Sequence, residues 1–153
     1  TIANNGTRLK THLVKQVTNY NRDQVISETE PEVVSQVDIS QENLKIVQEA
    51  MKGVTQSGGT ANSIFGDYGI TIAAKTGTAE NPGHSDNVTF IAYAPYDDPE
   101  IAVAVVLEYG SRGTYSMNVA KDIFDAYFYG KTVDENGNLV MPEETNNSGT
   151  TNE

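Results

Sequence analysis

The segment ITIAAKTGT at residues 70–78 begins apolar and ends polar, which is typical of a β-strand that leaves the core at its carboxyl end. Two further apolar segments follow, residues 88–94 and residues 101–109, and the turn-forming sequence PYDDPE separates them. Short connections between strands favour antiparallel pairing. The sequence therefore predicts an antiparallel meander of these three segments.

Two amphipathic helices are predicted around this meander. One covers residues 40–53, with Ser40 as its N-cap, and the other covers residues 116–129 and ends at Gly130. The apolar face of the second helix is predicted to contain Met117, Ala120, Ile123, Phe124, Tyr127 and Phe128. This face should cover one side of the meander. The predicted fold class is therefore α+β, an antiparallel sheet with covering helices.

The two ends of the chain are predicted to differ from this central part. Residues 11–19 and 24–29 are extended on either side of an Asn-Arg-Asp turn, which indicates a β-hairpin. From residue 131 onward the chain is polar and acidic, as in disordered tails. We therefore expect residues 1–130 to belong to a folded domain and residues 131–153 to form a disordered acidic tail.

Composition excludes several classes of function. Among 153 residues, 21 are acidic and 10 are basic, and the resulting net charge of −11 opposes binding to nucleic acid. The chain has no cysteine, so it has neither disulfides nor a thiol nucleophile. Its longest apolar run, residues 101–107, is far shorter than the roughly 20 residues of a membrane-spanning helix. We expect a globular domain with no nucleic-acid partner.

The Lys75-Thr76-Gly77-Thr78 sequence is the sharpest functional signal in the chain. Strand alternation sends Lys75 and Gly77 to one face and Thr76 and Thr78 to the other, so one ligand can meet all four only at a strand that borders a cleft. There, Gly77 would allow a peptide to approach, Lys75 would supply positive charge, and the threonine hydroxyls could donate to a carboxylate. We therefore expect residues 75–78 to lie on an edge strand.

The sequence around this motif resembles the carboxyl-terminal part of a class B penicillin-binding protein transpeptidase domain. The resemblance rests on GGTA at residues 58–61, KTGTAE at residues 75–80, FIAYAP at residues 90–95 and the closing amphipathic helix. It extends over about residues 1–129. It implies a partial domain of the β-lactamase and transpeptidase-like fold.

The resemblance implies a peptidoglycan D,D-transpeptidase that cross-links stem peptides through a serine acyl-enzyme and is acylated by β-lactam antibiotics. Lys75, Thr76 and Thr78 would bind the substrate carboxylate, Gly77 would allow its approach, and the Thr78 N–H would donate to the oxyanion. No metal or organic cofactor is implied. Such enzymes act at the extracytoplasmic face of the bacterial membrane behind an anchor that this chain lacks, and the cell-wall synthesis machinery is a further partner that the resemblance suggests.

The nucleophile of this family is missing from the chain. The family has a serine in an S-x-x-K element and a further S-x-N element, both before K-T-G. No serine here has a lysine three residues later, and Ser85-Asp86-Asn87 spells S-x-N only after Lys75, where we interpret it as coincidence. We therefore expect the chain to start within a domain, to depend on the remainder of the transpeptidase domain for its serine, and to be inactive alone.

Two alternative functions fit the same residues. The first is a β-lactamase or a D,D-carboxypeptidase of the same superfamily, which transfers the acyl group to water. The second is a transpeptidase-like module without catalytic activity that binds a cell-wall peptide or a partner protein. A deacylation assay on the full-length protein distinguishes the first alternative from a transpeptidase, because only the first releases the acyl group to water quickly. The coding sequence that precedes Thr1 distinguishes the second, because S-x-x-K and S-x-N elements there would support the enzyme.

Overall fold

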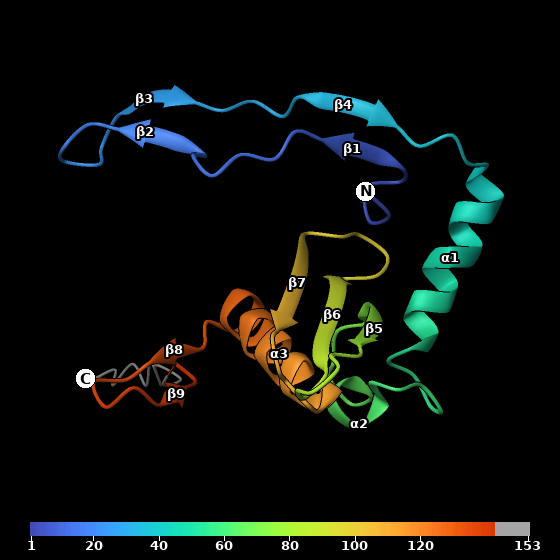
Figure 1. Ribbon diagram of the computed structural model, residues 1–153. Helices are drawn as coiled ribbons and strands as arrows, with labels where there is room; N and C mark the ends of the chain where they lie inside the picture. Colours follow the sequence, from blue (N-terminus) through green and yellow to red (C-terminus); the bar gives the residue numbers. More distant parts are fainter. Residues whose placement is uncertain (143–153) are drawn as a thin grey trace, which may run out of the picture.

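The centre of the molecule is a three-stranded antiparallel sheet, seen in a computed structural model that describes residues 1–142 (Figure 1). Its strands are β5 (Ala73–Ala79), β6 (Asn87–Ala94) and β7 (Ile101–Leu107), in the order β5-β6-β7. The predicted meander is confirmed. Strand β7 ends at Leu107, two residues before the predicted end, and Tyr109 lies in the left-handed region with φ 54°, which strands do not adopt.

Helix α3 (Gly113–Tyr129) covers one face of this sheet, as predicted. Phe90 of β6 and Phe124 of α3 are fully buried, and the Phe65 ring stacks on Phe90 with ring centroids 5.5 Å apart. The predicted apolar face of α3 was too wide, because Ile123 and Tyr127 are 38% and 52% exposed. The helix begins three residues earlier than predicted.

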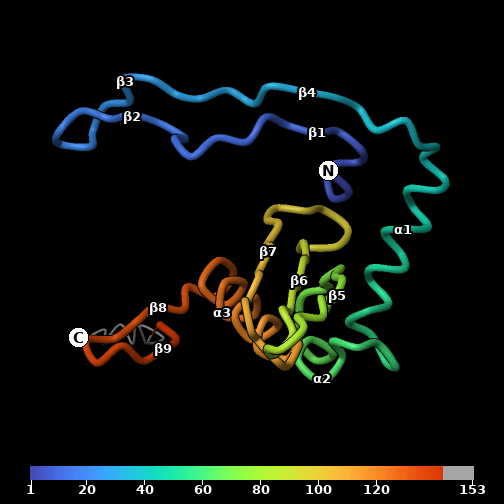
Figure 2. The backbone as a smooth tube through the Cα atoms, viewed as in Figure 1, coloured from blue at the N-terminus to red at the C-terminus, as the bar shows by residue number. Residues whose placement is uncertain are grey.

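Helix α1 (Gln41–Gly53) leads from the amino-terminal strands to the short helix α2 (Asn62–Phe65), as the backbone trace in Figure 2 shows. The predicted N-cap is confirmed, since the Ser40 hydroxyl accepts the Asn43 N–H at 3.2 Å. Helix α1 lies against β5 through Met51, which packs with Ala73 and Tyr93. The sheet therefore buries its core against α3 on one face and is covered only in part by α1 on the other.

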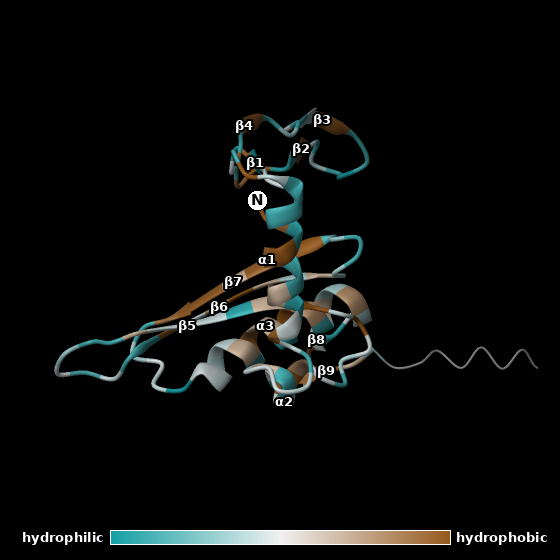
Figure 3. Cartoon of the chain, turned by 90° about the vertical axis from the view of Figure 1, so that its right-hand side faces the viewer, coloured by the Kyte–Doolittle hydropathy of each residue, from teal (hydrophilic) through white to brown (hydrophobic). Residues whose placement is uncertain are grey.

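The amino-terminal strands form an arm, residues 7–36, that lies apart from the sheet in the views of Figures 1 and 3. The predicted hairpin is present as β2 (Gln16–Thr18) paired with β3 (Val25–Glu28). Its continuation pairs β1 (Thr7–Leu9) with β4 (Val33–Gln36), and the sequence had not indicated β1. Most apolar residues of the arm are exposed. A two-stranded ribbon of this kind gains little stability by itself.

The chain after α3 ends its described part in a small hairpin of β8 (Thr132–Val133) and β9 (Leu139–Val140). The Asp134 carboxylate accepts the backbone N–H groups of Asn136 and Asn138 and thereby shapes the turn. Of the predicted disordered tail, residues 143–153 lie outside the described residues, and a domain boundary at residue 130 stays a prediction. Within residues 1–142, none of the helices combines the length and apolar character needed to cross a bilayer.

Candidate substrate-binding strand

The Lys-Thr-Gly-Thr sequence lies at the edge of the sheet. Residues 75–78 of β5 pair with residues 88–91 of β6, and among the described residues no strand pairs with the other flank of β5. Lys75 and Thr78 are exposed, whereas Thr76 and Gly77 are half-buried. The free flank therefore offers backbone N–H and C=O groups to an extended peptide, which is how an edge strand binds one.

The two faces of β5 differ in what they meet. Ala74 is buried in the core beneath α3, whereas Ala73 packs with Met51 of α1 on the opposite face. Alternation then places Thr76 and Thr78 on the α3 side and Lys75 and Gly77 on the α1 side. The strand leaves the core between Ala74, which is 0% exposed, and Lys75. A ligand at the free flank can thus meet the side chains of both faces.

The Lys75 ammonium lies over its own strand, where Nζ donates to the Thr76 carbonyl oxygen at 2.5 Å. In the part of the chain that the structure describes, Lys75 takes part in no ion pair. An unpaired ammonium at the surface is free to pair with an anion. Lys75 therefore offers its charge at the Thr76 backbone of the edge strand.

Gly77 has a structural reason to be glycine. A Cβ built at this position would lie 2.3 Å from the Thr89 Oγ1 of β6, far inside van der Waals contact. Gly77 and Thr89 are directly opposite in the ladder, where side chains come closest. The sequence suggested that a glycine at position 77 leaves room for a ligand. The structure adds that it also leaves room for the Thr89 side chain on β6.

A second hydroxyl meets Thr76 from a distant part of the chain. The Thr60 Oγ1 lies 3.5 Å from the Thr76 Oγ1. Thr60 belongs to the GGTA segment, whose sequence indicates no role for its hydroxyl. No local pattern could have placed it here, because the contact joins residues 16 positions apart across helix α2.

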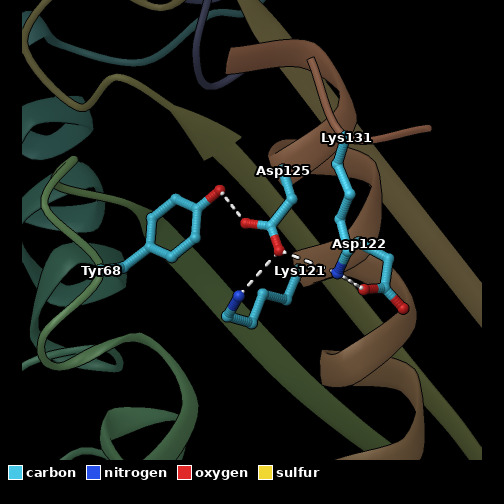
Figure 4. A network of polar contacts seen from close by, with 5 residues as sticks. All are labelled: Tyr68, Lys121, Asp122, Asp125 and Lys131. Atoms are coloured by element: carbon cyan, nitrogen blue, oxygen red, sulfur yellow. Dashed lines mark hydrogen bonds and ion pairs between the residues drawn. The ribbon is translucent and has the colours of Figure 1, made fainter. Parts of the chain in front are cut away.

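A buried polar network lies between α3 and the segment that follows α2 (Figure 4). The Asp125 carboxylate accepts hydrogen bonds from the Tyr68 hydroxyl at 2.8 Å, from Lys121 at 2.8 Å and from Lys131 at 3.2 Å. Lys131 also pairs with Asp122 at 2.6 Å. Sequence reasoning missed this network, although an aspartate beside Phe124 on an amphipathic helix was a usable signal.

Ionisation of Asp125 is governed by two opposing effects. Burial alone would raise the pKa of its carboxyl, but the hydrogen bonds from Lys121, Tyr68 and Lys131 outweigh burial and hold the pKa below its usual value. Burial and the bond to Asp125 raise the pKa of Tyr68, so its hydroxyl stays protonated and donates. The network fixes the segment before β5 to α3, and it lies outside the candidate binding strand.

The Ser85-Asp86-Asn87 sequence lies where the loop after β5 enters β6, and it is hydrogen-bonded to the segment that follows β7. The Asp86 carbonyl oxygen accepts the Ser111 N–H at 3.1 Å, and the Asn87 Oδ1 accepts the Tyr109 N–H at 2.9 Å. These bonds close the end of the sheet. Asp86 and Asn87 therefore have a structural role in joining the start of β6 to the segment after β7, which does not depend on an S-x-N element.

A Lys-Thr-Gly sequence on the edge strand of an antiparallel sheet between helices is characteristic of the serine acyl-enzyme class that includes penicillin-binding proteins and serine β-lactamases. Comparison with known proteins is more specific. Residues 1–128 match the family described as penicillin binding protein transpeptidase domain, so the chain belongs to that family. The predicted resemblance and fold class are confirmed.

Individual relatives agree with this assignment. Penicillin-binding protein 2A of Bacillus subtilis is 35% identical over 147 residues, a match that covers 84% of this chain and 20% of the relative. The peptidoglycan D,D-transpeptidase MrdA of Escherichia coli is 30% identical over 116 residues, covering 65% of this chain and 18% of the relative. The chain thus spans about a fifth of the length of the curated relatives it matches.

A solved structure shows the same arrangement. The imipenem acyl-enzyme complex of penicillin-binding protein A from M. tuberculosis superimposes with a TM-score of 0.67 and 28% identity. The match covers 82% of this chain and 28% of that protein. The sheet and its covering helices are therefore those of a penicillin-binding protein.

Proposed function

We propose that this chain is the substrate-binding part of a serine D,D-transpeptidase that cross-links peptidoglycan stem peptides and is acylated by β-lactams. The observation that carries the proposal is that residues 75–78 lie on the unpaired edge strand β5, with Lys75 and Thr78 exposed, in a chain that belongs to the transpeptidase family. The relative named as a peptidoglycan D,D-transpeptidase and the imipenem acyl-enzyme structure support this substrate and this inhibitor class.

In the proposed reaction this chain binds the stem peptide and polarises its carbonyl group, and a serine elsewhere in the complete protein attacks that carbonyl. The serine Oγ attacks the carbonyl carbon of the penultimate D-alanine, the terminal D-alanine leaves with a protonated amine, and a serine ester remains. An amine of a neighbouring stem peptide then attacks the ester and returns the serine. The Thr78 N–H is assigned to the oxyanion, where loss of one donor typically costs about 3 kcal/mol.

The carboxylate of the terminal D-alanine is assigned to Lys75, Thr76 and Thr78. The Lys75 ammonium supplies charge, and the hydroxyls of Thr76 and Thr78 donate from the other face of the strand. Because stem peptides are cross-linked outside the cell, the complete protein is expected at the extracytoplasmic face of the membrane. Its partners there would be the cell-wall synthesis machinery.

The uncovered face of the sheet is assigned to the remainder of the transpeptidase domain. Ile91 and Val106 on this face are 44% and 67% exposed, and an apolar hollow of about 450 Å³ lies between α1 and Ile91. The Tyr93 hydroxyl is buried on the same side and has no hydrogen-bond partner among residues 1–142. Since the relatives are about five times longer than their match to this chain, they contain ample polypeptide to cover such a face.

The docking of that remainder can be tested at Val106. In the complete protein, Val106→Asp should lower the free energy of unfolding by at least about 2 kcal/mol, because a covered face would bury an unpaired charge. Val106→Ile should change it little. If both variants unfold like the parent protein, the face is not covered.

The proposed function is tested by acylation of the complete protein with a labelled penicillin. Lys75→Ala should lower the second-order rate constant by about 30-fold to 100-fold, the effect of losing one charge-assisted hydrogen bond. Lys45→Ala, which removes an exposed lysine of α1, is the matched control and should leave the rate unchanged. Unaltered acylation of Lys75→Ala would disprove its role.

The fate of the acyl group separates the transpeptidase from its alternatives. A transpeptidase should hold the penicilloyl ester for many minutes and transfer a stem peptide to an added amine. Rapid release to water would indicate a β-lactamase or a D,D-carboxypeptidase. Complete absence of acylation, together with absence of an S-x-x-K element from the complete protein, would indicate a binding module.

A further inference from the structure

The Thr60 and Thr76 hydroxyls face the same small region from two separate segments. Their oxygens are 3.5 Å apart, beyond the 2.5–3.0 Å of a good hydroxyl hydrogen bond. Neither hydroxyl has another partner among the described side chains and backbone groups. The hydroxyl hydrogens are therefore free to donate to a third group.

The segment that carries Thr60 is held tightly on both sides. The Ala61 N–H donates to the Val54 carbonyl oxygen at 2.9 Å, and Ala61 itself is fully buried. A Cβ at Gly59 would lie 2.2 Å from the same Val54 oxygen, so only glycine fits there. Thr60 thus projects from a backbone with little freedom, while its own side chain stays exposed. A hydroxyl placed in this way needs little reorganisation to bind a ligand.

We propose that Thr60 is a further substrate-binding residue, which donates its hydroxyl together with Thr76 to the carboxylate of the bound peptide or β-lactam. This inference rests on the proposed function. A carboxylate oxygen about 2.7–2.8 Å from each of two hydroxyls fits a separation of 3.5 Å. Lys75, whose ammonium lies at the Thr76 carbonyl oxygen, supplies positive charge from the same strand.

The role assigned to Thr60 makes it a determinant of specificity. Its hydroxyl stabilises a charged carboxylate more than the neutral carbonyl of an ester at the same place, because hydrogen bonds to charged acceptors are the stronger ones. A penicillin and the methyl ester of the same penicillin therefore report on it directly. The preference of the complete protein for the acid over the ester is the quantity to measure, as a ratio of second-order acylation rate constants.

In the complete protein, Thr60→Val should lower acylation by the penicillin at least about tenfold, the lower end of the effect of one hydrogen bond to a charged group, and should lower acylation by the ester several-fold less. Thr60→Ser, which keeps the hydroxyl, should retain the preference. Ser57→Ala, at an exposed position of the same loop, is the matched control and should behave as the parent protein.

The alternative outcomes are distinct. Equal losses with acid and ester would assign Thr60 a structural role and overturn the inference, and so would an unchanged preference in Thr60→Val. If Thr76→Val abolishes the preference while Thr60→Val does not, the proposed function stands and only Thr60 is excluded. A parent protein without acylation, or without preference for the acid, would overturn the proposed carboxylate site itself.

Discussion

Replacing Tyr68 by phenylalanine removes a single hydroxyl from the network that joins the segment before β5 to α3. The Tyr68 ring is 9% exposed and packs edge-on against Phe65 with centroids 5.8 Å apart, a contact that phenylalanine keeps. Only the 2.8 Å hydrogen bond to Asp125 is lost. The perturbation therefore isolates one buried bond to a carboxylate.

The expected magnitude follows from what the carboxylate keeps. A hydrogen bond to a charged group contributes about 1.5–3 kcal/mol. Asp125 retains Lys121 at 2.8 Å and Lys131 at 3.2 Å, so it is not left as an unpaired buried charge. We expect Tyr68→Phe to lower the free energy of unfolding by about 2 kcal/mol, a value in the lower half of that range.

The assay is urea unfolding of the complete protein, with Tyr127→Phe as the matched control. The Tyr127 hydroxyl lies 3.5 Å from the exposed Glu100, so its loss should cost less than about 0.5 kcal/mol. In a double-mutant cycle with Asp125→Asn, Tyr68→Phe should show a coupling of about 1–2 kcal/mol. If Tyr68→Phe is no more destabilising than Tyr127→Phe, the reasoning from the buried carboxylate is wrong.

Three further changes test other parts of the structure. Asp125→Asn should lower the free energy of unfolding at neutral pH, and the difference from the parent protein should shrink below about pH 4. The reason is that the lowered pKa of Asp125 contributes stability above the ordinary aspartate pKa, and this contribution is lost as the pH falls. Equal destabilisation at pH 3 and pH 7 would contradict this prediction. Gly77→Ala should cost about 1–3 kcal/mol through its clash with Thr89, and Gly77→Ala combined with Thr89→Ala should regain most of that loss in the same unfolding assay. Ser40→Ala should cost about 1 kcal/mol by leaving the Asn43 N–H without its cap, and an unchanged urea midpoint would show that the cap is dispensable.

Local sequence signals accounted for most of the central fold. The turn between residues 94 and 101, the Ser40 cap and the left-handed Gly130 at the end of α3 are each specified within a few residues. Pairing of β1 with β4 is different, because it joins Thr7 to Gln36 across an intervening hairpin. Neither β1 nor β4 has enough apolar alternation to predict a pairing partner so distant in the chain.

The sequence by itself determined that residues 75–78 end a strand with a charge, two hydroxyls and a glycine, since strand periodicity and residue chemistry are local properties. Tertiary structure alone decided that this strand is an edge, that Gly77 must clear Thr89, and that the Thr60 hydroxyl reaches Thr76. It also brought Tyr68 to Asp125, 57 residues away. Such contacts arise when whole elements pack, and no window of sequence contains both partners.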